Sequence, residues 1–565
     1  MSASPAVIQR AVRPQAFARL LSAGFHPLLA RIYAGRGVED AADLDDAFER
    51  LHGLDGMLNL RPMARLLADA IAARARLLIV ADYDADGATA CAVGIRALRA
   101  FGADVSYLVP NRFEYGYGLT PEIVRLAWDR HRPDVLITVD HGIASIEGVA
   151  EANRQGMRVL VTDHHLPADS LPQAWCIVNP NQTACAFQSK HLAGVGVIFY
   201  VMLALRAELR TRGVLEREPS MAALLDLVAL GTVADVVRLD ANNRVLVRQG
   251  LKRMRAGRMQ PGVAALFQTA GRDPARASAY DLGFVLGPRL NAAGRLADMA
   301  IGIECLVTDD AGRAAELARA LDALNRERRE IEARMQEEAL ARLDADPGES
   351  YTLSVFDAEW HQGVIGIVAS RLKERFHRPV VAFARGSAGE LKASGRSIAA
   401  LHLRDALDLV SKRHPGLLLR FGGHAAAAGL TVRETQFPEF RDAFEATARS
   451  LLTAGDLELQ IETDGSLDTN ELTFDLARAL SDGVWGQGFP EPRFFDSFDV
   501  VEQRIVGGEH LKARLRRAGR AFEAILFGTT GPLPERIEAV YRVGLNEFNG
   551  SYALQLTLHH WRPAA

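Results

Sequence analysis

The sequence predicts an α/β protein in which a parallel-sheet domain is joined by a long helix to a smaller α/β domain and then followed by a β-barrel module. Three observations predict this class. Apolar β-type runs alternate with helical stretches between about residues 75 and 165, apolar residues recur at helical spacing from 309 to 344, and short alternating runs dominate after residue 457. The chain of 565 residues is long enough for roughly three to four domains.

Residues 1–48 are expected to form an N-terminal arm. The segment carries several arginines and no acidic residue before Glu39, a composition that transit peptides share. Its apolar residues include Phe17, Leu20 and Leu28, and no low-complexity spacer separates it from the residues that follow. We therefore favour an amphipathic arm that packs on the protein over a cleaved targeting segment.

Residues 49–308 are predicted to form the parallel-sheet domain. Its expected strands are the apolar runs Leu77–Val80, Val105–Val109, Val135–Val139 and Val159–Val161. Helix-forming residues separate these runs, and residues 193–300 look mainly helical. Strands that are apolar throughout are typical of a parallel sheet with helices on both faces. In such sheets, functional groups gather just beyond the carboxyl ends of the strands.

The remaining segments complete the predicted architecture. Residues 309–345 form the expected connecting helix, because apolar residues recur at helical spacing among many Arg and Glu residues. Residues 346–453 have the mixed pattern of a second α/β domain. Residues 454–565 are rich in β-type runs and turn signals, among them Asn549–Gly550, and fit a small β-barrel.

Composition restricts the class of protein further. The formal net charge of −4 neither requires nor excludes a nucleic-acid partner, so any polyanion site must come from local Arg and Lys clusters. The longest apolar stretch, residues 193–205, is shorter than the ~20 residues that a membrane helix needs, and we expect no membrane association. The four cysteines form no CxxC pair, which favours reduced thiols and a cytoplasmic location.

An acidic cluster follows the first predicted strand. Asp82, Asp84 and Asp86 occupy alternating positions directly after it. Like charges this close together are costly when buried unless a cation neutralises them. An EF-hand calcium loop is excluded, because the helix–loop–helix setting and the glutamate at the twelfth loop position are both absent from the sequence.

Two further predicted strands end in similar groups. Asp140 follows the strand at 135–139, and Asp163, His164 and His165 follow the next one. Such a set, joined by Asp235 from a later apolar segment, suits Mn²⁺ or Mg²⁺ because it contains carboxylates and imidazoles but no thiolate. Two cations bridged by one carboxylate catalyse in-line phosphoryl displacement. The pattern therefore predicts phosphoester hydrolysis, with Asp140 as the bridge because its strand is expected between the other two.

The Asp163–His165 triplet and the upstream acidic motif resemble the DHH phosphoesterase superfamily. Similarity to its bacterial single-strand-specific 5′→3′ DNA exonucleases extends from about residue 25 to the end of the chain. It is carried by further motifs: 80–89, 109–119, 230–237, 287–295, 393–397, 421–429, 504–512 and 545–550. The resemblance implies a DHH catalytic domain, a DHH-associated domain and an oligonucleotide-binding fold.

The resemblance also implies roles for individual residues. The expected metal ligands are Asp82, Asp84, Asp140, His164 and Asp235. His165 would contact the scissile phosphate and, with Asp140, carry the catalysis, whereas Asp86 and Asp163 would support the site. The expected substrate-binding residues are Arg112, Tyr117, Arg289, Asn291, Arg295, Ser394, Arg396 and His424. Arginine suits phosphate because its guanidinium group donates two parallel hydrogen bonds.

The final module is expected to extend the path of the single strand. Its basic stretch is Lys512, Arg514, Arg516, Arg517 and Arg520, and Phe522 or Phe548 would stack on bases. The predicted function is a monomeric exonuclease of DNA repair and recombination, dependent on two divalent cations, Mn²⁺ or Mg²⁺. The resemblance implies single-stranded-DNA-binding protein and a helicase as partners. Two alternatives remain: a small-substrate DHH phosphoesterase acting on nanoRNA or cyclic dinucleotides, and an inactive Cdc45-like replication scaffold.

Overall fold

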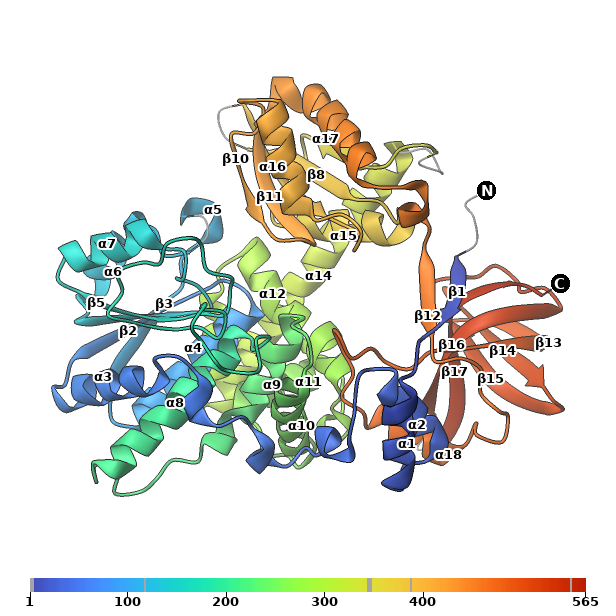
Figure 1. Ribbon diagram of the computed structural model, residues 1–565, viewed down its shortest axis with the longest axis horizontal. Helices are drawn as coiled ribbons and strands as arrows, with labels where there is room; N and C mark the ends of the chain where they lie inside the picture. The colour runs from blue at the N-terminus through green and yellow to red at the C-terminus, as the bar shows by residue number, and fades with distance from the viewer. Residues whose placement is uncertain (1–4, 116–117, 343–347, 387–388, 549–550, 565) are drawn as a thin grey trace. The chain divides into compact units, whose positions relative to one another are not determined.

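A computed structural model describes residues 5–115, 118–342, 348–386, 389–548 and 551–564 (Figure 1). Tyr117 and the Asn549–Gly550 turn lie outside these residues, as do the side chains of Arg112 and Phe548. The chain divides into two compact units, one made of residues 11–325 and 466–561 and the other of residues 1–10, 326–465 and 562–565. Among the helices described, none is long and apolar enough to cross a membrane.

The first unit contains the predicted parallel sheet (Figure 1). Its strands are β2 (Arg76–Ala81), β3 (Asp104–Leu108), β4 (Val135–Val139), β5 (Arg158–Thr162) and β6 (Cys176–Val178). They pair in the order β3-β2-β4-β5-β6, and all pairs are parallel. The four strands predicted from the sequence are confirmed, and β4 lies between β2 and β5 as expected. β6 has only three residues and was not predicted from the sequence.

Helices cover both faces of this sheet. Successive strand residues point to opposite sides, so each strand contributes apolar side chains to both layers. Leu77 and Ile79 pack in one core with α3 (Leu60–Ala72), α4 (Ala85–Ala100) and α8 (Gly194–Thr211). Leu78 and Val80 pack in another core with α6 (Pro121–His131) and α7 (Ile146–Arg154). The continuous apolar runs are therefore explained by burial on both faces.

The segment after α8 is mainly helical, as predicted. It comprises α9 (Leu225–Ala234), α10 (Ala241–Arg255), α11 (Pro261–Thr269), the π-helix η6 (Asp281–Leu286), α12 (Gly287–Leu296), α13 (Ala300–Val307) and α14 (Ala311–Arg342). A short 3₁₀ turn, η5 (Pro274–Arg276), precedes η6, which continues directly into α12. The long α14 confirms the predicted connecting helix.

The last part of the first unit is a closed barrel, which confirms the predicted β-barrel. Its strands are β13 (Phe494–Val506), β14 (His510–Arg517), β15 (Arg520–Leu526), β16 (Arg536–Phe548) and β17 (Ser551–Pro563), in the order β13-β14-β15-β17-β16. Alternate residues such as Phe494, Phe498 and Leu515 fill its interior. Helices α1 (Pro14–Ser22), α2 (Pro27–Ala34) and α18 (Phe474–Ser481) also belong to this unit.

The second unit contains the smaller α/β domain. Its strands are β7 (Leu353–Asp357), β8 (Val380–Arg385), β9 (Glu390–Arg396), β10 (Arg420–Gly423) and β11 (Ala427–Arg433), in the order β10-β11-β9-β8-β7. Only the pair β7–β8 is parallel among these described strands. Helices α15 (Ile365–Phe376), α16 (Leu403–Arg413) and α17 (Phe437–Leu451) complete the domain.

The N-terminal arm begins with a strand and continues into α1 and α2. Its first described element is a strand, β1 (Ala6–Gln9), which pairs in parallel with β12 (Gln460–Thr463). Leu20 and Leu28, on the helices that follow, are buried as expected, whereas Leu21 is exposed.

Candidate metal centre

The turn from β2 to α4 brings the first three acidic residues together. Asp82 directly follows β2, and Asp84 is the N-cap of α4, where its Oδ1 accepts a hydrogen bond from the Gly87 N–H at 2.9 Å. Asp86 lies in the first helical turn and is buried. The turn is tight, because a Cβ on Gly87 would lie 2.6 Å from the carbonyl oxygen of Asp82.

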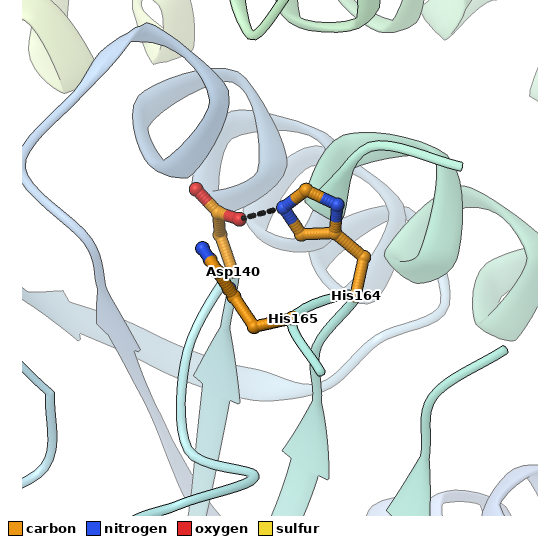
Figure 2. A group of neighbouring side chains, drawn as sticks. All are labelled: Asp140, His164 and His165. Atoms are coloured by element: carbon orange, nitrogen blue, oxygen red, sulfur yellow. Dashed lines mark ion pairs between the residues drawn. The ribbon is translucent and has the colours of Figure 1, made fainter. Parts of the chain in front are cut away.

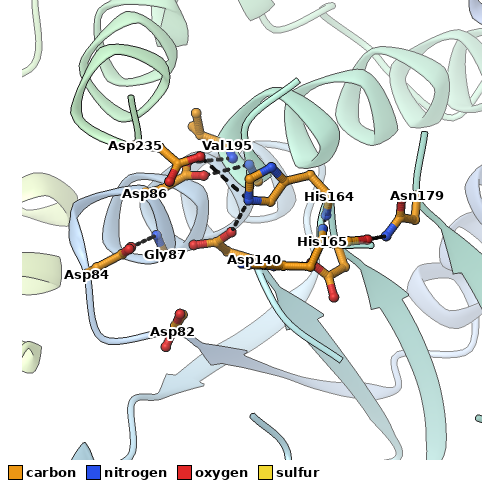
Figure 3. Close-up of polar contacts among 12 residues, drawn as sticks. Asp82, Asp84, Asp86, Gly87, Asp140, His164, His165, Asn179, Val195 and Asp235 are labelled. Carbon is orange, nitrogen blue, oxygen red and sulfur yellow. Dashed lines mark hydrogen bonds and ion pairs between the residues drawn. The ribbon is translucent and has the colours of Figure 1, made fainter. Parts of the chain in front are cut away.

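Asp140 directly follows β4 and is buried, with a left-handed φ of +67°. Aspartate and asparagine tolerate this conformation better than most residues with a side chain. Figure 3 shows the Asp140 carboxylate pointing toward His164, with Asp84, Asp86 and Asp235 close by. The centre is thus assembled from the ends of neighbouring strands, as the sequence predicted.

Asp163 holds the two histidines that follow β5. Its Oδ1 accepts hydrogen bonds from the backbone N–H groups of His164 (2.7 Å) and His165 (3.0 Å), and it lies 2.8 Å from the Nδ1 of His165. Its Oδ2 accepts from the N–H of Ile143 at 2.8 Å. Burial alone would raise the pKa of Asp163, but these hydrogen bonds and the charge of His165 lower that pKa to about 2. Asp163 is therefore an ionised support for both histidines.

Three buried acceptor atoms converge beside Asp140. The Nε2 of His164 lies 3.1 Å from Asp140 Oδ1 and 3.5 Å from Asp235 Oδ2 (Figure 2 shows the first of these pairs). Among the described residues, none of the three atoms has a hydrogen-bond partner. Burial and the charge of His165 lower the pKa of His164 to about 4, so its imidazole is neutral near neutral pH. A divalent cation would satisfy all three atoms at once.

The electrostatics of the carboxylates favour the same ligand. Burial and the charge of Asp84 raise the pKa of Asp86 to about 7. Burial and the charges of Asp86 and Asp84 raise the pKa values of Asp140 and Asp235 well above their usual range. A bound cation would relieve this repulsion and return the carboxylates to their ionised form.

Three groups of side chains could each hold a cation. Within each group, the ligand atoms lie within 4.8 Å of one another. These groups are Asp82–Asp84–Asp140, Asp86–His164–Asp235 and Asp140–His164–His165. Asp140 belongs to two of them, so its position suits a carboxylate shared between two cations.

Asp86 is already engaged by the backbone. Its Oδ2 accepts from the Gly194 N–H at 2.6 Å and its Oδ1 from the Val195 N–H at 2.8 Å (Figure 3). Both oxygens therefore anchor the N-terminus of α8. This geometry fits the supporting role that the sequence analysis expected for Asp86.

Several residues around the centre were missed by the sequence analysis. The Nδ2 groups of Asn179 and Asn181 donate to the carbonyl oxygens of His165 (2.9 Å) and His164 (2.6 Å). Both asparagines follow β6, so recognition of that short strand would have placed them at the same sheet edge. Gly194 allows α8 to approach Asp140, because a Cβ there would lie 2.6 Å from Asp140 Oδ1.

The expected substrate-binding residues of the first unit differ in their surroundings. The Oδ1 of Asn291 accepts a hydrogen bond from the Ala85 N–H at 2.8 Å, so Asn291 secures the acidic turn. Arg289 lies 2.9 Å from Asp322 in an ion pair, and it also donates to the carbonyl oxygen of Val285. Arg295 lies near the end of α12.

The other expected substrate-binding residues lie in the second unit. The Nη1 of Arg396 donates to Ser394 Oγ at 3.1 Å and to the carbonyl oxygen of Gly395 at 2.8 Å. Burial lowers the pKa of Arg396. His424 lies in the turn between β10 and β11, where its N–H donates to the Ala427 carbonyl oxygen at 2.8 Å. The substrate-binding roles of all these residues stay predictions.

A parallel sheet whose strand ends gather carboxylates and imidazoles is the arrangement expected of a metal-dependent phosphoesterase. Family models match all three parts of the chain: the DHH family N-terminal domain over residues 76–232, the DHHA1 domain over 348–450 and the RecJ OB domain over 463–560.

Full-length relatives agree with the family models. The chain is 50% identical over 553 residues to the single-stranded-DNA-specific exonuclease RecJ of Dickeya dadantii, covering 95% of this chain and 96% of that protein. The structure is similar to that of Thermus thermophilus RecJ in complex with Mn²⁺, with a TM-score of 0.83, 31% identity and coverage of 99% of this chain and 79% of the other. The Mg²⁺ complex gives a TM-score of 0.77, 29% identity and coverage of 99% and 78%. The chain belongs to the RecJ family.

Proposed function

We propose that this protein is a metal-dependent exonuclease that hydrolyses single-stranded DNA to mononucleotides in the 5′→3′ direction. The observation that carries the proposal is the convergence of Asp140 Oδ1, His164 Nε2 and Asp235 Oδ2, three buried acceptor atoms without a protein donor among the described residues. The relatives named as single-stranded-DNA-specific exonucleases supply the substrate class.

Two divalent cations, Mn²⁺ or Mg²⁺, fit the residues present. Asp82, Asp84 and Asp140 would hold one ion, and Asp140, His164 and Asp235 the other, with Asp140 shared between them. When bound, such a pair activates water and stabilises the leaving oxygen of an in-line phosphoryl displacement. Asp86 keeps α8 in place beneath the ligands through its two backbone hydrogen bonds.

His165 is suited to steady the phosphate that reacts. Burial would lower its pKa, but the hydrogen bond to Asp163 and the charge of Asp163 outweigh burial and raise the pKa of His165. Its Nδ1 lies 2.8 Å from Asp163 Oδ1, so Asp163 orients the ring, and the imidazole would donate to a phosphate oxygen when it is protonated. Charge that develops on that oxygen is then stabilised by an oriented donor.

The 5′ phosphate would be held by residues of the second unit. The half-buried Arg396 and the Oγ of Ser394 form a donor pair suited to a phosphate monoester, and His424 adds a further donor. Arg112, Tyr117, Arg289 and Arg295 complete the proposed substrate path, and the ion pair of Arg289 with Asp322 would have to rearrange for a direct contact.

The cellular setting is also part of the proposal. The enzyme would act as a monomer in the cytoplasm during DNA repair and recombination, together with single-stranded-DNA-binding protein and a helicase. All four cysteines are buried and unbridged, which fits a reducing compartment.

Two alternatives are less well supported. A small-substrate phosphoesterase would have no use for the closed barrel of β13–β17, which resembles a module that binds single strands. An inactive replication scaffold would not be expected to retain the complete ligand set of Asp82, Asp84, Asp140, His164 and Asp235.

A polarity assay tests the proposal. With Mn²⁺, a single strand labelled at its 3′ end should shorten stepwise while the label stays on the remaining strand, and a 5′ label should be released at once as a mononucleotide. Blunt duplex should be degraded poorly. Asp140→Ala should abolish hydrolysis, and full activity of that variant would remove the shared-ligand assignment. Degradation from the 3′ end would overturn the polarity while leaving a phosphoesterase.

A further inference from the structure

Two exposed aromatic rings stack on each other at the start of the helix that leads into α12. Tyr280 and Phe284 are 53% and 72% exposed, and their ring centroids lie 5.0 Å apart with an interplanar angle of 22°. Their neighbours Leu282, Val285 and Leu286 are buried in the core. Polar side chains normally occupy the outward face of such a helix, so folding does not require two large rings there.

The helix that carries this pair packs against the end of α9, the helix that Asp235 directly follows. η6 packs on the end of α9, where a Cβ on Gly283 would lie 3.1 Å from Val233, two residues before Asp235. η6 then continues into α12, whose Asn291 secures the acidic turn through Ala85. Phe284 and Asn291 are seven residues apart, which corresponds to about 10 Å along a helix. That length equals about three stacked nucleotides at ~3.4 Å each.

The backbone of η6 is itself unusual. It is a π-helix, a geometry that occurs mostly as single turns and frequently at functional sites. Asp281 caps its start by accepting hydrogen bonds from the N–H and Oγ–H groups of Ser278. The turn therefore holds Tyr280 and Phe284 in one fixed, outward-facing arrangement.

A second group of exposed aromatic rings, from the end of the chain, lies against Arg276, four residues before Tyr280. Arg276 of η5 lies over the ring of Tyr552 on the barrel, 4.8 Å from its centroid, and Phe474 contacts the edge of the same ring at 6.4 Å. Tyr552 and Phe474 are 43% and 42% exposed. Arg276 thus links the segment that leads into η6 to exposed rings at the barrel, within the first unit.

We propose that Tyr280 and Phe284 form a stacking platform for the bases of the single strand that follow the nucleotide being cleaved, and that Arg276, Tyr552 and Phe474 continue this platform onto the barrel. The inference rests on the proposed function, because it names where that substrate lies. Aromatic rings bind bases of any sequence, since every base has a π face. Such a platform would hold a strand in register while leaving the enzyme indifferent to sequence.

Binding measurements without turnover test the platform. The full chain would be titrated with a fluorescent single strand in EDTA, so that hydrolysis does not occur. Stacking of one base on an aromatic side chain changes affinity by about fivefold to about a hundredfold. The double variant Tyr280→Ala/Phe284→Ala should bind about tenfold more weakly, while Tyr280→Phe/Phe284→Trp should restore affinity. Val214→Ala, which removes a 55% exposed apolar side chain after α8, is the matched control and should bind like wild type.

Strands that lack one base distinguish stacking on a base from general apolar contact with the strand. A single abasic nucleotide moved along the strand should weaken binding to the wild type most when it lies about two to five nucleotides from the 5′ end, and it should not weaken binding to the double variant further. Equal losses in both proteins would overturn the platform. Wild-type affinity of the double variant for intact strands would overturn it as well.

Two further outcomes separate this proposal from others. If sedimentation showed that the double variant dissociates a dimer of the wild type, the rings would be a subunit contact and the platform would be refuted. If the wild type did not hydrolyse single strands at all, the proposed function would fail. If it did hydrolyse them and the double variant had an unchanged KM, the platform alone would fail.

Discussion

Replacement of Gly194 by alanine is expected to weaken cation binding while the protein stays folded. A Cβ at this first residue of α8 would lie 2.6 Å from the Oδ1 of Asp140, the atom that faces His164. Carbon–oxygen contacts in proteins lie at about 3.3 Å or more. The same Cβ would also lie 2.6 Å from the Asp140 Cβ, so the whole Asp140 side chain, carboxylate included, must move by roughly 0.7 Å to admit the methyl group.

That displacement sets the size of the effect. Metal centres hold their ligands within about 0.2 Å of the preferred distances, so the shifted Asp140 would be a poor ligand. A loss of about 10- to 100-fold in Mn²⁺ affinity is expected, as is typical when groups that position a ligand are disturbed. This corresponds to about 1.4 to 2.8 kcal/mol of binding free energy.

Calorimetric titration with Mn²⁺, together with the Mn²⁺ concentration for half-maximal hydrolysis, would measure the loss. The matched control is Gly196→Ala on the same helix, where the three atoms nearest to the new Cβ all belong to the Leu192 side chain, the first of them at 2.9 Å. Wild-type Mn²⁺ affinity in Gly194→Ala would refute the assignment of Asp140 as a ligand. An equal loss in Gly196→Ala would show that the helix, and not the carboxylate, is responsible.

Asp226, His165 and Asn291 give three further predictions. Burial raises the pKa of Asp226 to about 6, above its value near 4 in the unfolded chain. The contribution of this group to the free energy of unfolding is therefore fully present below about pH 4 and is lost as the pH rises through about 6. Asp226→Asn should therefore be more stable than wild type by about 3 kcal/mol near pH 8 and equal to it near pH 4, as denaturant titrations would show; a gap that is independent of pH would contradict this. His165→Gln should lower kcat by about 10²- to 10³-fold with little change in Mn²⁺ affinity, because a phosphate donor is lost, and an unchanged kcat would exclude that role. Asn291→Ala should cost about 1 kcal/mol in unfolding free energy and raise the Mn²⁺ requirement, because the Ala85 N–H loses its acceptor; a normal melting temperature and normal Mn²⁺ response would argue against this.

Much of the metal centre could be predicted from the sequence because most of its candidate ligands directly follow strands of the parallel sheet. The apolar runs before Asp82, Asp140 and Asp163 identified three parallel strands, and the structure places those strands next to one another in the sheet. Parallel neighbours deliver their carboxyl ends to one edge, so a local pattern was sufficient to bring distant residues together. The connecting helix and the final barrel were predicted from periodicity in the same way.

The parts that were missed depend on contacts without a local signature. The pairing of Ala6 with Gln460 joins two segments that are far apart in the sequence, and neither segment contains a local pattern that identifies the other as its partner. The π-helix at 281–286 differs from an α-helix by hydrogen-bond register, which side-chain periodicity does not resolve over six residues. Gly194 looked like an ordinary residue in an apolar run, since only the folded structure reveals how closely it approaches Asp140.

The left-handed backbone conformation at Asp140 determines which substitution can inactivate the enzyme without straining the fold. Most residues with a side chain lose free energy at a φ of +67°, whereas asparagine tolerates that region nearly as well as aspartate. Alanine at this position would therefore combine a missing ligand with backbone strain of about 1 kcal/mol. Asparagine would remove one of the crowded negative charges and keep the turn intact. Asp140→Asn is thus the variant expected to stay well folded and to trap an intact strand for structure determination.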